Sequence, residues 1–256
     1  MVAERYEPMN GARRRAAVFD LDGTLADTSA DLIAGANLTL ARLGASARLD
    51  AARDAGVSGR GGRAMLRLGL SRAGWPEAEV EGAIDSVYAH FLTDYEGVIA
   101  DRSVLFPGVE AALDVLEGQG WRLAICTNKP ERLARLLLTE LRVLDRFGAL
   151  VGADTLPVRK PDPRPFFAAA AGAGALPGAS VMIGDTVTDR ETARQAGVPC
   201  ILMDFGLSAD DVHALGAEAV TADFAALPAL LARLAPGGRS FPAPAAPTAE
   251  SRAKGA

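Results

Sequence analysis

Acidic residues gather in two short loops whose spacing suits the binding of a cation. Asp20 and Asp22 lie two residues apart in the segment Asp20–Leu25, directly after an apolar run, so both side chains can point the same way. Asp185 and Asp189 lie four residues apart, so both can face one ligand if a helix begins there. Carboxylates crowded together repel one another, and a hard cation with oxygen ligands removes that penalty. The sequence therefore predicts a Mg²⁺ site built from these four aspartates.

Two further loops carry groups that bind phosphate oxygens. Thr127 can donate a hydrogen bond to a phosphoryl oxygen, and Lys160 can neutralise charge on a transferring group. Lysine is rare in this chain, and both Lys129 and Lys160 fall in these loops, which favours a functional role because guanidinium does not freely replace ammonium at a phosphate site. Backbone N–H groups around Gly23 can reach the same oxygens. Since aspartate carboxylates can form aspartyl-phosphates, these parts predict phosphoryl transfer.

The loops that carry this chemistry follow expected strands of a parallel sheet. Short runs that are apolar on both faces indicate central strands at Ala16–Asp20, Arg122–Cys126, Val181–Gly184 and Cys200–Met203, with Ala149–Val151 as a weaker candidate. Helical patterns alternate with them at Val109–Gln119, Pro130–Leu141, Pro163–Ala171 and Asp189–Ala196. This alternation predicts an α/β fold with a doubly wound, Rossmann-like parallel sheet. Ligands of such sheets bind beyond the carboxyl ends of the strands, where all four loops lie.

The segment from about Thr28 to Asp101 breaks the alternation. It contains helical patterns at Asp31–Leu43, Gly62–Leu70 and Glu77–Leu92 and no convincing strand. Because it is much longer than an ordinary strand-to-helix connection, we predict an inserted all-helical cap domain over residues 29–101, within a core formed by residues 15–28 and 102–234. Residues 1–14 are expected to be a loose leader, and residues 235–256 a disordered tail rich in Pro and Ala.

The composition excludes several classes of protein. With 256 residues, 49% of them hydrophobic, and a net charge of −5, the chain can bury a core but does not generally attract nucleic acid or anionic membranes. The first apolar run is too short for a signal peptide or a membrane helix. Cys126 and Cys200 are too few for a disulfide scaffold, and the 2 histidines exclude multi-histidine metal sites. We expect a cytoplasmic monomer or homodimer whose partner is a small phosphorylated metabolite.

Five stretches together resemble the haloacid dehalogenase-like hydrolase family. They are Val18–Thr28 (VFDLDGTLADT), Phe106–Val109 (FPGV), Ala124–Glu131 (AICTNKPE), Thr155–Pro163 (TLPVRKPDP) and Ile183–Gly197 (IGDTVTDRETARQAG). The resemblance covers about residues 16–232 in order. Within the family, the stretches look most like those of phosphoglycolate phosphatases.

The resemblance implies a role for each aspartate. Asp20 would be the nucleophile and a metal ligand. Asp22 would be the general acid and then the general base, with its backbone carbonyl on Mg²⁺. Asp185 would bind the metal directly, and Asp189 would support the metal or its waters. Family dehalogenases lack an acid at the position of Asp22 and family ATPases carry Thr there, so the resemblance implies a phosphatase or a phosphomutase.

The same resemblance implies which residues hold the phosphoryl group and the substrate. Thr127 and Lys160 would hold the phosphoryl group. Gly23, Thr24 and Asn128 lie in the same motifs and are expected to contact substrate.

The expected cap contains a segment suited to reading the rest of the substrate. Val57–Arg63 carries glycines that permit close approach, and Arg60 or Arg63 could pair with a substrate carboxylate. We therefore expect Mg²⁺-dependent hydrolysis of 2-phosphoglycolate to glycolate and phosphate.

Three alternative functions remain open at this point. A sugar phosphomutase resembling β-phosphoglucomutase would share every core residue. A phosphatase for another small metabolite, or a non-catalytic protein that kept the fold, would also match the motifs. Each site residue also has a structural explanation, since Asp and Thr cap helices and Lys and Arg are commonly solvated.

Overall fold

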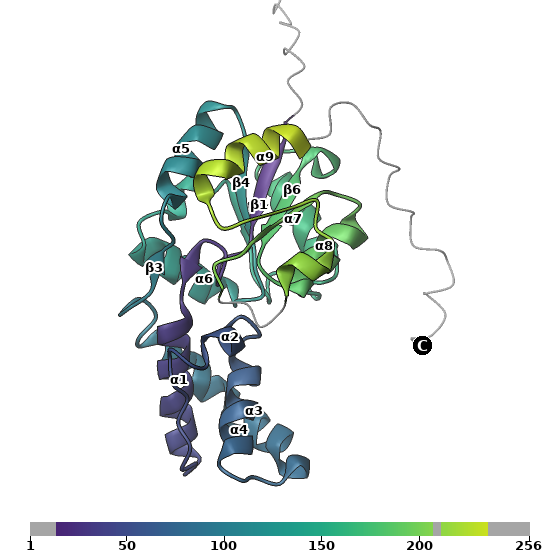
Figure 1. Cartoon of the computed structure of the whole chain (residues 1–256). Coiled ribbons are helices and arrows are strands. Elements are labelled where there is room, and N and C mark those ends of the chain that lie inside the picture. The colour runs from purple at the N-terminus through teal and green to yellow at the C-terminus, as the bar shows by residue number, and fades with distance from the viewer. Residues whose placement is uncertain (1–13, 207–210, 235–256) are drawn as a thin grey trace, which may run out of the picture.

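The computed structural model describes residues 14–206 and 211–234, within which a parallel sheet of six strands forms the core (Figure 1). The strands are β1 (Ala16–Phe19), β4 (Arg122–Cys126), β5 (Ala149–Val151), β6 (Val181–Gly184), β7 (Cys200–Met203) and β8 (Ala219–Thr221). Their order across the sheet is β5-β4-β1-β6-β7-β8, and every pairing is parallel. The order reverses at β1, so the loop after β1 lies at the switch point where such sheets bind ligands.

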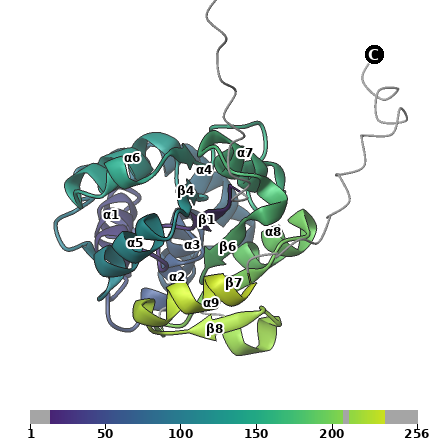
Figure 2. The ribbon, with the colours of Figure 1, turned by 90° about the horizontal axis from the view of Figure 1, so that it is seen from above.

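Helices bury both faces of the sheet. Alternate residues of a strand point to opposite faces, so Ala17 and Phe19 join one apolar cluster while Ala16 and Val18 join another. The first cluster includes α5 (Val109–Gly118), α6 (Glu131–Glu140) and α9 (Leu227–Leu234), and the second includes α7 (Arg164–Gly172) and α8 (Val187–Ala196). Figure 2 shows α5 and α9 on one side of the sheet and α7 and α8 on the other. This double burial explains why β1 reads as an uninterrupted apolar run.

The helical insertion forms a bundle that faces one end of the sheet (Figure 1). Its helices are α1 (Ser29–Arg42), α2 (Ala55–Ser58), α3 (Gly62–Arg72) and α4 (Glu77–Glu96). The chain leaves the core through β2 (Ala26–Asp27) and returns through β3 (Val104–Leu105), and these two strands pair antiparallel. In Figure 1, α2 is the bundle helix nearest the sheet. The fold class expected from the sequence is confirmed, while the limits of the core and cap domains stay predictions.

The expected elements are present, but several end at different residues. β1 stops at Phe19, one residue before the expected end, and α4 continues past Leu92 to Glu96. The helix continues to Glu96 because buried residues recur every three or four positions along its whole length. These are Val80, Ile84, Val87, Phe91 and Tyr95. β2 and β3, of 2 residues each, are too short to show a pattern, and β8 is only half-buried along its 3 residues, so none of the three was expected from the sequence.

Further short turns connect these elements. Single 3₁₀ turns lie at η1 (Leu144–Arg146), η2 (Pro177–Ala179), η3 (Val212–Leu215) and η4 (Phe224–Ala226). The expected leader, apart from Arg14, and the expected Pro/Ala-rich tail lie outside the described residues. In the described part of the chain, every helix is too short or too polar to cross a bilayer.

A buried aspartate joins the two connections between the bundle and the core. Asp31, in the first turn of α1, is fully buried, and one of its oxygens accepts hydrogen bonds from the Arg102 N–H at 2.8 Å and the Ser103 N–H at 2.7 Å. The Ser103 hydroxyl donates to the same oxygen at 2.8 Å. The outgoing and returning segments are therefore bound to each other where the bundle begins.

Gly35 allows α1 and α4 to pack closely, which leads to the first prediction. A Cβ on Gly35 would lie 2.8 Å from the Cα of Tyr95, a backbone atom that cannot rotate away. We expect Gly35→Ala to lower the free energy of unfolding by about 1–3 kcal/mol through overpacking. Urea unfolding followed by circular dichroism measures this change.

Gly82 provides the matched control within the same bundle. It is exposed in the middle of α4, and a Cβ there would meet nothing within 4 Å. Gly82→Ala should therefore leave stability unchanged or raise it by up to about 1 kcal/mol through helix propensity. Equal effects of the two substitutions would contradict the close approach at Gly35.

Candidate active site

The register of the sheet brings the predicted site residues to one edge. Phe19 lies opposite Ile125 of β4 and Ile183 of β6, so the residues that follow these three strands meet at the same level. The Asp20 N–H donates to the Ile183 carbonyl at 2.8 Å, which holds the end of β1 against β6. Asp20, Thr127 and Asp185 are all buried there.

Lys160 connects two of the aspartates. Its ammonium lies 3.0 Å from Asp20 Oδ2 and 2.6 Å from Asp189 Oδ1, and the residue is only 3% exposed. Burial alone disfavours the charged ammonium, but Asp189 and Asp20 outweigh it and raise the pKa of Lys160 above its usual value. The side chain is therefore a permanent positive charge beside Asp20.

Three carboxylates crowd around that single ammonium. Oxygens of Asp20, Asp185 and Asp189 all lie within 4.8 Å of one another. Burial raises the pKa of Asp20 to about 6, with a further rise from neighbouring Asp189 and Asp22, against the lowering effects of Lys160 and a hydrogen bond from Thr127. Burial, followed by Asp189 and Asp20, also raises the pKa of Asp185. The excess of negative charge and the all-oxygen donors fit a divalent cation such as Mg²⁺.

Asp189 combines a structural contact with its place in this cluster. Its Oδ2 accepts hydrogen bonds from the Thr186 N–H at 3.1 Å and the Thr186 hydroxyl at 2.7 Å. The Thr186 side chain also accepts from the Asp189 N–H, and this bond and the one from the Thr186 N–H form a capping box at the start of α8. Its other oxygen binds Lys160. The same fully buried side chain therefore caps α8 and lies in the carboxylate cluster, while its support of a metal stays a prediction.

Gly23 and Thr24 lie against the carboxylate of Asp185. Gly23 has φ +80°, and a Cβ there would lie 2.4 Å from Asp185 Oδ2, so only glycine fits. Its N–H donates to the Ala26 carbonyl at 2.9 Å, so this one of the backbone N–H groups around Gly23 is bonded within the protein. Thr24 is fully buried and donates its hydroxyl to Asp185 Oδ1 at 2.7 Å. Both residues therefore constrain the carboxylate of Asp185, and the expected contact of Gly23 and Thr24 with substrate stays a prediction.

The side chain of Asp22 lies outside the carboxylate cluster, beside a lysine that the sequence analysis did not assign to the site. Lys129 Nζ lies 2.8 Å and 3.1 Å from the two oxygens of Asp22, and the Thr28 hydroxyl donates to Asp22 Oδ1 at 2.7 Å. Lys129 is 6% exposed and also donates to the Tyr95 hydroxyl at 2.7 Å. The rarity of lysine in the chain was the only signal for this residue. Neighbouring Asn128 is exposed and donates its amide to the Lys160 carbonyl at 3.1 Å.

The helical bundle closes over this edge. A cleft of about 10 Å³, room for about one water molecule, is bounded by core and bundle residues: Asp22, Gly23, Asp27, Thr28, Ser29, Ser58, Gly59 and Asp185. A Cβ on Gly59 would lie 3.9 Å from Asp185 Oδ2. The expected close approach of this glycine-containing segment is therefore present.

The two candidate arginines of the bundle differ. Arg63 donates to Asp85 at 2.7 Å and to Glu81 at 3.1 Å, and these acids raise its pKa. Its expected pairing with a substrate carboxylate is not supported, because its guanidinium already binds two carboxylates of α4. Arg60 is exposed and follows Gly59 directly.

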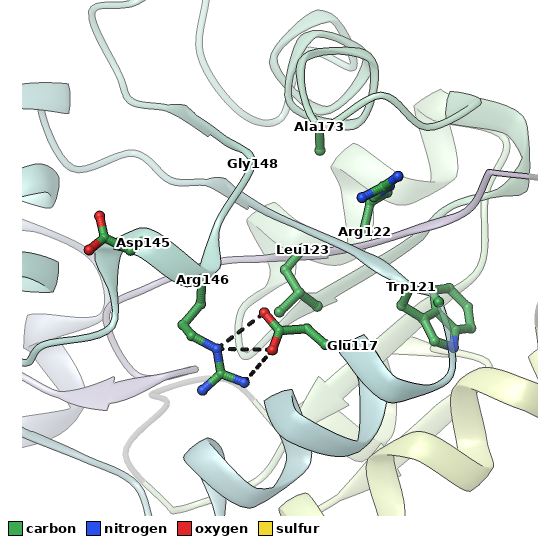
Figure 3. A pocket seen from close by; sticks show the side chains of 9 residues that line it. Glu117, Trp121, Arg122, Leu123, Asp145, Arg146, Gly148 and Ala173 are labelled. Carbon is green, nitrogen blue, oxygen red and sulfur yellow. Dashed lines mark hydrogen bonds and ion pairs between the residues drawn. The ribbon is translucent and has the colours of Figure 1, made fainter.

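A second cavity lies away from this chemistry. It has a volume of about 380 Å³ and lies at the start of β4, lined by Trp121, Arg122 and Leu123 together with Glu117 and Arg146 (Figure 3). None of the site residues expected from the sequence lines it. The tight cleft at the carboxyl ends of the strands therefore remains the candidate active site.

Comparison with known proteins agrees with this geometry. The family model for haloacid dehalogenase-like hydrolases matches residues 14–197. The chain is 40% identical over 222 residues to the phosphoglycolate phosphatase of Caulobacter vibrioides, covering 86% of this chain and 90% of that protein. The crystal structure of a predicted phosphoglycolate phosphatase from Haemophilus somnus superposes with a TM-score of 0.73 at 24% identity, covering 86% of this chain and 99% of the other.

A protein named for a different reaction shares this fold. A putative β-phosphoglucomutase from Thermotoga maritima superposes with a TM-score of 0.63 at 21% identity, covering 86% of this chain and 99% of the other. At this level of identity the likeness concerns the fold alone. With its motif residues gathered at the switch point of the sheet and a family model that spans most of its length, the chain belongs to the haloacid dehalogenase-like hydrolase family.

Proposed function

We propose that this chain is a Mg²⁺-dependent phosphatase that hydrolyses 2-phosphoglycolate to glycolate and phosphate through a phosphorylated aspartate. The observation that carries the proposal is the position of Asp20 at the end of β1, 3.0 Å from the ammonium of Lys160 and within 4.8 Å of two further carboxylates. The extensive identity to a phosphoglycolate phosphatase supports both the reaction and the substrate.

In this proposal Asp20 attacks the phosphorus atom of the monoester. A bond forms between a carboxylate oxygen and phosphorus, and the bond from phosphorus to the ester oxygen breaks. Asp22 gives a proton to the departing oxygen, and its carboxylate then takes a proton from the water that attacks the aspartyl-phosphate. Inorganic phosphate leaves, and Asp20 is restored. Lys160 and Thr127 hold the phosphoryl oxygens throughout.

The carboxylates of Asp20 and Asp185 and the backbone carbonyl of Asp22 would hold Mg²⁺, with Asp189 supporting the site. When bound, the ion neutralises the buried carboxylates and the charge of the phosphoryl group. Thr24 and Gly23 contribute indirectly, because both contact Asp185 and define its orientation.

The bundle would exclude water and recognise the rest of the substrate. The cleft of about 10 Å³ is too small for a phosphate ester, so the bundle must move away from the core to admit one. The proposal assigns the substrate carboxylate to Arg60, because it directly follows Gly59, whose Cβ position would lie 3.9 Å from Asp185 Oδ2.

A substrate assay tests the nucleophile. We expect the wild-type protein with Mg²⁺ to release phosphate from 2-phosphoglycolate, and Asp20→Asn to lower kcat by roughly 10³-fold or more while keeping the fold, because the amide cannot accept the phosphoryl group. Phosphate release and circular dichroism measure the two effects. Unchanged turnover by Asp20→Asn would refute the mechanism. Conversion of a sugar phosphate into its isomer without phosphate release would instead favour a phosphomutase.

The raised pKa of Asp20 predicts how Mg²⁺ affects stability. Because the pKa is about 6 in the folded chain and 3.8 ordinarily, the folded metal-free protein binds more protons than the unfolded chain between these values, so its stability falls as pH rises through that range. Mg²⁺ should remove this loss. We expect the increase in Tm on replacing EDTA by Mg²⁺ to be larger at pH 7.5 than at pH 5, and Asp20→Asn to reduce the difference. Equal increases at both pH values would contradict a metal bound by ionised Asp20.

The two arginines form a matched test of substrate recognition. Arg60→Ala should raise KM for 2-phosphoglycolate about tenfold, the loss expected for one charge-assisted hydrogen bond, and leave KM for p-nitrophenyl phosphate, which has no carboxylate, unchanged. Arg63→Ala should change neither value, since that guanidinium binds Glu81 and Asp85. Steady-state kinetics of both variants on both esters provide the comparison. An increase for both esters with Arg60→Ala would reject the assignment.

A further inference from the structure

Lys129 is a buried ammonium whose donors are already used within the protein. Its side chain is 3% exposed, and it reaches both oxygens of Asp22, at 2.8 Å and 3.1 Å, and the hydroxyl of Tyr95, at 2.7 Å. An ammonium has three protons to donate, so these contacts use its capacity fully. Lys129 therefore differs from Lys160, whose partners Asp20 and Asp189 belong to the carboxylate cluster.

The partners of Lys129 come from different parts of the fold. Asp22 follows β1 in the core, whereas Tyr95 lies in the last turn of α4 in the helical bundle. Lys129 itself follows β4, and its N–H donates to the Thr127 hydroxyl at 3.2 Å. The ammonium thus spans the boundary between the catalytic loops and the bundle.

Packing holds the Tyr95 hydroxyl firmly within the bundle. The residue is 1% exposed, its ring stacks on Phe91 at a centroid distance of 6.2 Å, and its backbone lies against Gly35 of α1. The ammonium of Lys129 also lies 4.4 Å from the centre of the Tyr95 ring. A movement of the bundle away from the core would therefore withdraw a hydroxyl and a ring face from Lys129.

Asp22 has few other ways to be held in place. One of its oxygens accepts the Thr28 hydroxyl at 2.7 Å, and Lys129 contacts both oxygens. Without the ammonium, the partly buried carboxylate of Asp22 would keep one side-chain hydrogen bond within the described residues, the one from the Thr28 hydroxyl. The orientation of Asp22 thus depends on Lys129, and that of Lys129 on Tyr95.

We infer that Lys129 is a positioning residue for Asp22, and that Tyr95 makes this positioning depend on the packing of α4 against the core. The inference rests on the proposed role of Asp22 as the acid that protonates the leaving oxygen. The ammonium holds both oxygens of Asp22, and the Tyr95 hydroxyl holds the ammonium in turn.

The dependence of the reaction on the leaving group tests this link. An alkoxide such as that of glycolate needs a proton to leave, whereas p-nitrophenolate leaves without one, so a misplaced acid slows the first ester far more than the second. Tyr95→Phe keeps the ring and removes only the hydroxyl. We expect it to lower kcat/KM for 2-phosphoglycolate about tenfold and for p-nitrophenyl phosphate less than about twofold. Lys129→Met should show the same selectivity with a larger loss, about 100-fold for the alkyl ester.

Tyr88→Phe is the matched control. Tyr88 lies on the same helix and stacks on Phe91, but within the described residues no hydrogen bond joins its hydroxyl to Lys129. It should leave both kcat/KM values unchanged. Equal losses on both esters for Tyr95→Phe would indicate a general structural role and overturn the inference, as would no loss on either. If the wild-type protein hydrolyses neither ester, the proposed function itself fails. If it hydrolyses both and the variants show no selectivity, only the link fails.

Discussion

The site depends on how the buried negative charges at the end of β1 are compensated. Three buried carboxylates, those of Asp20, Asp185 and Asp189, lie within 4.8 Å of one another and face the single ammonium of Lys160. Such an arrangement is unfavourable in a protein interior unless further positive charge is added. The same excess of negative charge suits a divalent cation, which could bind beside the carboxylate that we propose as the nucleophile. The surrounding fold can be understood as the means of holding these charges together.

The two buried lysines divide the charge of the site between them. Lys160 compensates the cluster around Asp20, and Lys129 compensates Asp22 on the side of the helical bundle. Each aspartate after β1 therefore has its own ammonium, which keeps the two carboxylates in separate environments although they are two residues apart. Separate environments suit separate roles, one as nucleophile and one as acid and base.

Several residues of the motifs contact the aspartates themselves. Thr24 and Gly23 define the position of Asp185, and Thr186 holds Asp189 through the capping box. Motif residues of this kind are easily assigned to substrate from sequence, because a hydroxyl or a glycine N–H looks the same in either role. The tertiary contact gives Thr24 a structural role, since its hydroxyl donates to Asp185 Oδ1 at 2.7 Å.

The sequence by itself determined the strands, their alternation with helices and the aspartates that follow them, because these features depend on local periodicity and spacing. Only the tertiary structure decided which partners the long cationic side chains take. Lys129 contacts Asp22, which is 107 residues away along the chain, and Tyr95, which is 34 residues away. Arg63 contacts Asp85, which is 22 residues away. No local pattern encodes such contacts, since each depends on how the bundle packs within itself or against the sheet. That packing, set by the burial of apolar faces, placed Lys129 beside Asp22 and Arg63 beside Glu81 and Asp85.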